Sequence, residues 1–131
     1  EQVQAYASEY GLEIISCYHR NGWADHCLMN LSPQGWLWLI KQAHAVVTNT
    51  FHGIIFSARL EKPFIVEFNP AIRLKTEGLI EKMGLQSRVF RQSTKLEQSL
   101  AQEIDYSIAG ETAMNEAARA KKWLEIQLED A

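Results

Sequence analysis

Apolar residues in this chain gather in short continuous runs. LEIISC (12–17), AVVT (45–48) and FIVEF (64–68) are rich in β-branched and aromatic residues, which predicts strands. SRVF (87–90) predicts a further short strand at a sheet edge, whereas residues 18–30 show no period and predict an irregular segment. Because the runs do not alternate with polar residues, we expect buried parallel strands that are covered on both faces.

Segments with helical spacing separate these runs. Ser32 is a typical N-cap and Pro33 suits the first helical position, so a helix should follow them, while Gly11 and Gly84 predict helix ends. The predicted helices cover residues 2–10, 33–43, 53–60, 75–83, 94–103 and 111–129, and a loop is predicted over residues 69–74. The alternation of strands and helices predicts an α/β fold: one Rossmann-like domain over residues 1–131, with a parallel sheet and flanking helices.

Composition narrows the class of protein. Of the 131 residues, 47% are hydrophobic and 22% are charged, which is typical of a folded, soluble domain. The net charge of −3 gives no basic field for nucleic acid, and no apolar run reaches the ~18–20 residues of a membrane span. The first residues lack a signal-peptide pattern. We therefore expect a cytoplasmic protein with no membrane span and no nucleic-acid partner.

Two cysteines, Cys17 and Cys27, lie near His19 and His26. Their spacing matches no zinc pattern, and two cysteines do not form a disulfide framework in a chain of this size. The sequence predicts free thiols and no metal site, with a single disulfide as the alternative.

The segment TNTFHG (48–53) follows a strand that ends at Thr48. Ligands of open parallel sheets bind beyond the C-terminal strand ends, where the next helix presents N–H groups and its positive dipole end. His52 is suited to bind a phosphate or carboxylate or to transfer a proton, and Gly53 lets the backbone approach a ligand. The alternative is that both residues serve packing.

The next strand end is followed by Arg73 and Lys75. Arginine grips an oxyanion with two parallel hydrogen bonds, and lysine adds a point charge. Both belong to a basic stretch that contains Arg73, Lys75, Lys82, Arg88, Arg91 and Lys95. Either this stretch is a solvated face, or the two strand ends form a site for a small, strongly anionic molecule.

Several motifs combine at a specific spacing. They are Ser32-Pro33, Val46–Thr48, Phe51-His52-Gly53, Phe56-Ser57, Lys62-Pro63-Phe64 and LIEKMGLQSR (79–88). This combination resembles the polysaccharide pyruvyl transferase family, and the resemblance covers residues 32–90.

The resemblance implies an enzyme that moves a pyruvyl group from phosphoenolpyruvate to a sugar hydroxyl, forming a ketal in surface polysaccharide or glycoconjugate synthesis. It implies no cofactor besides this donor substrate, and His52 would contact the donor. It also implies two facing Rossmann-like domains, as in GT-B glycosyltransferases, with the site in the cleft. This chain looks like the C-terminal domain of such an enzyme. Its partners would be phosphoenolpyruvate, a saccharide acceptor and an N-terminal domain of the same protein, without which we expect no activity.

One position departs from the family pattern. Some members carry arginine two residues before the histidine, where this chain has Thr50 and others have serine. A hydroxyl brings no charge, so Arg73 or Lys75 would have to supply it. Asn49 and Ser57 are further candidates for donor contacts, with local turn and helix chemistry as the alternative.

Two other functions stay open. One is a GT-B glycosyltransferase that uses a nucleotide sugar, for which Glu67 and Glu77 are the nearby candidates to bind a ribose. The other is a non-catalytic anion-binding domain of the same fold, which Thr50 favours.

Overall fold

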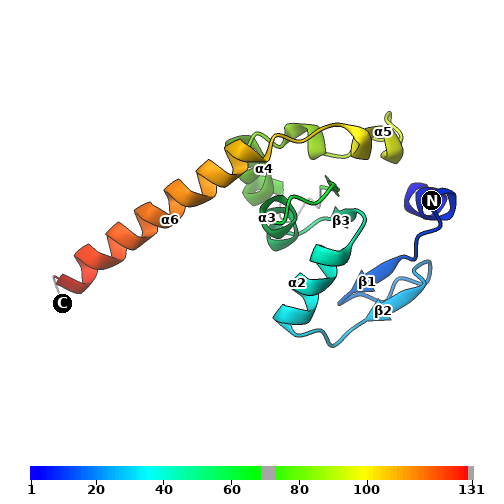
Figure 1. The fold of residues 1–131 in the computed structure, drawn as a ribbon, viewed down its shortest axis with the longest axis horizontal. Helices are drawn as coiled ribbons and strands as arrows, with labels where there is room; N and C mark the ends of the chain where they lie inside the picture. Colours follow the sequence, from blue (N-terminus) through cyan, green and yellow to red (C-terminus); the bar gives the residue numbers. More distant parts are fainter. Residues whose placement is uncertain (69–72, 130–131) are drawn as a thin grey trace.

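The chain folds into helices and three-residue strands, and helices alone follow the last strand (Figure 1). The structure, a computed structural model, describes residues 1–68 and 73–129. The helices are α1 (Gln2–Tyr10), α2 (Pro33–Gln42), α3 (Phe51–Arg59), α4 (Arg73–Lys82), α5 (Leu96–Ala101), α6 (Tyr106–Glu129) and the short 3-10 helix η1 (Gln86–Arg88). The strands are β1 (Ile15–Cys17), β2 (His26–Leu28), β3 (Val46–Thr48) and β4 (Phe64–Val66).

The strands pair in parallel, as predicted, but they form two small sheets within the described residues. In the first sheet, Ser16 of β1 lies opposite Cys27 of β2. In the second, Val47 of β3 lies opposite Ile65 of β4. A single parallel bridge joins Val89 to the other edge of β4. The α/β class with parallel strands and flanking helices is confirmed, and the described residues do not form a single continuous sheet.

The core surrounds β4, which is buried at all three residues. Phe64 and Val66 face one side, where residues of α3, α4 and α6 complete a hydrophobic cluster. Ile65 faces the other side and packs with Leu96 and Leu100 of α5. Successive residues of a strand point to opposite faces, so both faces of this strand are covered by helices. The expectation from its continuous apolar run is thereby confirmed.

The other strands differ from their predictions. The segment predicted to be irregular, residues 18–30, contains β2, so that prediction was wrong. All three residues of this strand are exposed, and an exposed strand need not show the apolar pattern of a buried one. The prediction of a buried strand was also wrong for part of β3, where Val47 is 44% exposed.

Most helix positions are confirmed, but three helices begin earlier than predicted, and one of them is α4, which begins at Arg73 and not at residue 75. Gly11 and Gly84 have φ angles of 62° and 66°, the left-handed conformation that ends a helix. The helix predicted from residue 53 begins at Phe51, and the one predicted from residue 111 begins at Tyr106. The segment SRVF is the end of η1 followed by the bridge at Val89. The loop predicted over residues 69–74 was wrong for Arg73 and Leu74, which belong to α4, and residues 69–72 lie outside the described residues.

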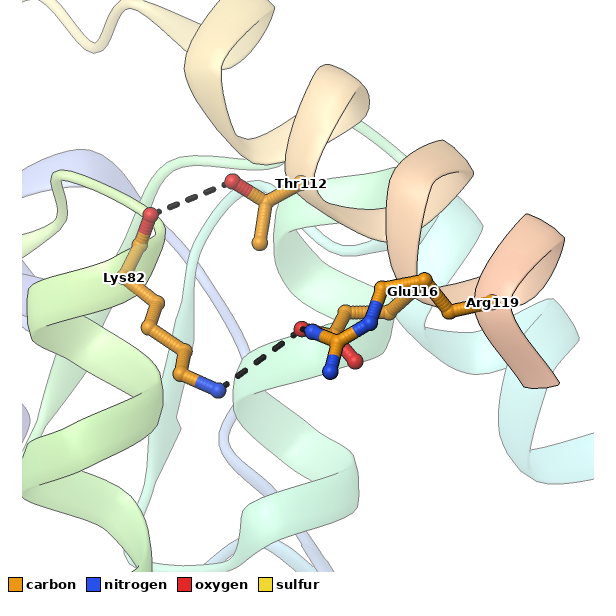
Figure 2. A network of polar contacts seen from close by, with 4 residues as sticks. All are labelled: Lys82, Thr112, Glu116 and Arg119. Atoms are coloured by element: carbon orange, nitrogen blue, oxygen red, sulfur yellow. Dashed lines mark hydrogen bonds and ion pairs between the residues drawn. The ribbon is translucent and has the colours of Figure 1, made fainter. Parts of the chain in front are cut away.

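Polar contacts join α4 to α6 (Figure 2). The Thr112 hydroxyl donates a hydrogen bond to the Lys82 carbonyl oxygen at 3.1 Å. Glu116 Oε1 lies 3.7 Å from Lys82 Nζ and 3.2 Å from Arg119 Nη1. Beyond this network, α6 extends away from the rest of the molecule, and its side chains over residues 114–126 are exposed (Figure 1).

Within the described residues, no helix combines the length and the hydrophobicity needed to cross a bilayer.

Candidate functional site

The two predicted strand ends lie at the same edge of the β3–β4 sheet. Thr48 and Val66, the last residues of the two parallel strands, are opposite each other. The Glu67 N–H donates a hydrogen bond to the Thr48 carbonyl oxygen at 2.9 Å, which continues the pairing by one residue. The segments that follow both strands therefore leave the sheet side by side, at the edge where ligands of parallel α/β sheets bind.

Hydrogen bonds among Thr48, Thr50 and Gly53 join the end of β3 to the first turn of α3. Thr50 is the N-cap, and its Oγ1 accepts a hydrogen bond from the Gly53 N–H at 3.0 Å. The Oγ1 atoms of Thr48 and Thr50 are 3.2 Å apart, and the Thr50 N–H donates to Thr48 Oγ1 at 3.2 Å. The Thr50 hydroxyl and the Gly53 N–H are thus already paired. The N–H groups of Phe51 and His52 donate no hydrogen bond to any described residue, so these two remain for a ligand.

Gly53 is buried against the end of β3. A Cβ atom at this position would lie 2.0 Å from Thr48 Oγ1 and 2.8 Å from Thr48 Cβ. No side chain fits at such distances, so the glycine is needed for the packing of α3 on β3. The structure thus gives a packing reason for Gly53, which was predicted to let the backbone approach a ligand, with packing as the alternative.

His52 and Asn49 are exposed at the edge. The imidazole of His52 lies edge-on to the Phe51 ring, with the ring centroids 5.9 Å apart, and it makes no hydrogen bond with a described residue. Its position in the first turn of α3 places it beside the two unpaired N–H groups. A ligand held at the helix N-terminus would therefore meet this imidazole.

Ser57 lies elsewhere. It is fully buried one turn further along α3, and its Oγ atom has no hydrogen-bond partner among the described residues. In this structure the hydroxyl has no exposed surface through which a ligand could reach it. The candidate site at the sheet edge therefore does not include this side chain.

Arg73 and Lys75 lie in the exposed first turn of α4. Arg73 Nε is 2.7 Å from Glu77 Oε1, and its guanidinium carbon lies 5.5 Å from the centroid of the Phe68 ring. Since Phe68 follows Glu67 at the sheet edge, this contact holds the guanidinium near the edge. The pairing with Glu77 offsets part of the charge of the Arg73 guanidinium. It also engages one of the two carboxylates that were predicted as candidates to bind the ribose of a nucleotide sugar.

A third segment leaves the same edge. The Phe90 N–H donates a hydrogen bond to the Val66 carbonyl oxygen at 2.8 Å, so the chain after Val89 runs parallel to β4. Arg91 follows this contact and is exposed. This arginine was predicted to belong to the basic stretch but not to the site. The predicted strand SRVF could have placed Arg91 at this edge, because the residue that follows a parallel strand ending at residue 90 lies at the carboxyl edge of the sheet.

The basic stretch is neither one solvated face nor one site. Lys82 pairs with Glu116, while Arg88 is completely buried. The expectation of a solvated face is therefore wrong for Arg88, whose Nη2 donates a hydrogen bond to Gln102 Oε1 at 3.3 Å.

One family model matches the segment from α1 to β4. Residues 4–66 match the family model of polysaccharide pyruvyl transferase. The match covers just under half of the 131 residues and ends at the last residue of β4. It confirms the resemblance to this transferase family over residues 32–66 and extends it towards the start of the chain. No curated protein and no solved structure matches the chain.

The matched segment contains most of the predicted site. It includes Asn49, Thr50, His52, Gly53 and Ser57. The two cationic candidates on α4 follow the matched segment. The chain is therefore similar, over this segment, to a transferase family whose name implies a polysaccharide acceptor, and the roles of single residues stay predictions.

Proposed function

We propose that this chain is the C-terminal domain of an enzyme that transfers a pyruvyl group from phosphoenolpyruvate to a sugar, forming a ketal, in the synthesis of surface polysaccharides or glycoconjugates. The observation that carries the proposal is the family match over residues 4–66, which includes the exposed His52 at the N-terminus of α3. An N-terminal domain facing this sheet edge, in a GT-B-like arrangement, would complete the site and hold the acceptor.

The donor carries a phosphate and a carboxylate, so its site needs several hydrogen-bond donors and positive charge. The first turn of α3 offers the N–H groups of Phe51 and His52 together with the positive end of the helix dipole. Arg73, Lys75 and Arg91 lie in segments that meet the same edge and would supply the charge that Thr50 lacks.

The reaction begins with a proton that adds to the methylene carbon of phosphoenolpyruvate, which becomes a methyl group and leaves C2 electrophilic. One sugar hydroxyl adds to C2, the bond from C2 to the phosphate oxygen breaks, and a second hydroxyl of the sugar closes the ketal. One hydroxyl proton replaces the proton taken up by the methyl group, and the other leaves with the phosphate. His52 would provide the proton to carbon, and the cations would stabilise the departing phosphate.

A non-catalytic anion-binding domain is the second candidate, and two observations favour it. The Thr50 hydroxyl is already paired within the chain, and Arg73 is paired with Glu77. Both leave fewer groups to stabilise charge in a transition state, whereas the N–H groups of Phe51 and His52 are still available to bind an anion.

The test combines binding with turnover. In the 131-residue chain, phosphoenolpyruvate should produce saturable amide shifts at Phe51 and His52, and a nucleotide sugar should not. In the whole protein, His52→Ala should lower the rate of phosphate release about 10²–10⁴-fold, the usual contribution of a general acid, with a smaller loss of donor affinity. His19→Ala, an exposed histidine in the β1–β2 connection, serves as the control and should change neither quantity.

Each alternative has its own outcome. A binding domain would show the shifts without phosphate release in the wild-type protein. Shifts produced by the nucleotide sugar alone would contradict the pyruvyl donor and favour a glycosyltransferase.

A further inference from the structure

Thr48 is the last residue of β3 and is buried where the sheet meets the first turn of α3. Its carbonyl oxygen accepts the Glu67 N–H at 2.9 Å, which fixes its backbone in the sheet. Its side-chain oxygen accepts the Thr50 N–H and lies next to Thr50 Oγ1, both at 3.2 Å. A Cβ atom on Gly53 would lie 2.0 Å from the same oxygen. The hydroxyl of a buried and fixed residue therefore connects the sheet with the start of α3.

The proton of the hydrogen bond between the two hydroxyls can come from Thr48 or from Thr50. If Thr48 donates it, Thr50 Oγ1 accepts two hydrogen bonds, one from Thr48 and one from the Gly53 N–H at 3.0 Å. A hydroxyl has two acceptor lone pairs and one proton, so the proton of Thr50 is then left to point outward. Thr50 is exposed, unlike Thr48. If Thr50 donates instead, its proton is used within the chain and a ligand receives none from it.

An anion at the sheet edge selects the first arrangement. A deprotonated oxyanion accepts hydrogen bonds and donates none, so the Thr50 hydroxyl binds it only with its proton pointing outward. The N–H groups of Phe51 and His52, which donate to no described residue, belong to the same turn of the chain. One oxyanion would thus meet donors from three consecutive residues, and the donor on Thr50 depends on the buried hydroxyl behind it.

We propose that Thr48 is a positioning residue of the candidate site: its hydroxyl donates to Thr50 Oγ1 and thereby directs the Thr50 proton towards the phosphate group of the donor. Thr48 itself does not touch the ligand. The inference rests on the proposed function for the identity of this ligand, and it adds a residue that was not among the predicted site residues. It also leaves Thr50 a role as a neutral donor, although its acceptor capacity is used within the chain.

The test compares two variants that differ by one oxygen atom. Thr48→Ala and Thr48→Ser both lose the γ-methyl group, but only the serine keeps the hydroxyl. The 131-residue chain is titrated with inorganic phosphate and with phosphoenolpyruvate, and the amide shifts of Phe51 and His52 are followed by NMR. Thr48→Ala should weaken the binding of both ligands about tenfold, the size of one hydrogen bond to a charged group, and Thr48→Ser should bind within about twofold of the wild type.

A double-mutant cycle separates positioning from a general loss of structure. If Thr48 acts through the Thr50 proton, Thr50→Ala removes the same donor. The double variant should then bind at most about twofold more weakly than Thr50→Ala alone. Ser16→Ala removes a buried hydroxyl of β1 that donates to the His19 carbonyl oxygen and accepts from the Asn21 side chain. This matched control should bind both ligands like the wild type, whatever its melting temperature.

The inference is overturned if the wild type shows no saturable shift with either ligand, if Thr48→Ala binds as the wild type does, if the serine and alanine variants lose affinity equally, or if the losses add in the double variant. The proposed function fails separately. If the whole protein releases no phosphate from phosphoenolpyruvate, pyruvyl transfer is contradicted, while weaker binding of inorganic phosphate by Thr48→Ala, restored in Thr48→Ser, still supports the positioning role of Thr48.

Discussion

At the scale of single residues, Gly53 leaves no room for a methyl group. A Cβ atom would lie 2.0 Å from the buried Thr48 hydroxyl oxygen, so either the strand end or the start of α3 must shift. We expect Gly53→Ala to lower the free energy of unfolding by about 1–3 kcal/mol, the usual cost of overpacking. Urea unfolding followed by circular dichroism measures this change.

Gly78 of α4 is the matched control. It is exposed, and a Cβ atom there would meet nothing within 4 Å. Gly78→Ala should raise the free energy of unfolding by about 0.5–1 kcal/mol, because alanine favours a helix. If Gly53→Ala were as stable as the wild type, the close packing of α3 on β3 would be contradicted, and ligand approach would remain the reason for this glycine.

The sequence predicts the position of a candidate site more readily than the contacts of each side chain in it. The expected site at His52 followed from one strand end and one helix start, both of which are local features. The environment of Arg88 could not be predicted, because its burial depends on Gln102 and Tyr106, which are distant in sequence. Likewise, Ser57 reads as a polar candidate, yet the position of α3 in the core buries its hydroxyl.

At the scale of elements, the start of α3 depends on Thr50. Its hydroxyl accepts the Gly53 N–H, which otherwise has no partner in the first turn. We expect Thr50→Ala to lower the free energy of unfolding by about 1 kcal/mol, whereas Thr50→Ser, which keeps the hydroxyl, should cost only a few tenths. Urea unfolding compares the variants. Equal stability of both variants and the wild type would show that this cap contributes nothing measurable.

Helix caps also show how far local signals predict elements. The start of α2 was predicted from Ser32 and confirmed, since its hydroxyl accepts the Gly35 N–H at 3.0 Å. The start of α3 was placed two residues late, because a glycine in FHG suggests a turn and the capping role of Thr50 was not used. The strand β2 was missed because its exposed residues carry no apolar pattern, and only its pairing with β1 defines it.

At the scale of the whole molecule, the two sheets are covered unequally. All three residues of β4 are buried between two helical layers, whereas all three of β2 are exposed. The helix that precedes the first sheet, α1, contacts α5: the Gln2 side chain accepts the Leu96 N–H at 2.9 Å, and Tyr10 donates to Glu97 at 2.9 Å. Sparse burial of this kind is typical of regions that open locally.

Hydrogen exchange of backbone amides tests this difference. The amides of Tyr18 and His26 bond across the β1–β2 pair, while those of Glu67 and Phe90 bond beside the buried β4. We expect the first pair to exchange at least about tenfold faster, because an opening that is 1.4 kcal/mol easier exchanges ten times more often. Equal protection of both pairs would mean that the sheets unfold as one unit. Such an outcome would agree with the continuous parallel sheet that the sequence predicts. It would also mean that contacts other than the two separate strand pairings couple the sheets, because those pairings alone do not join one sheet to the other.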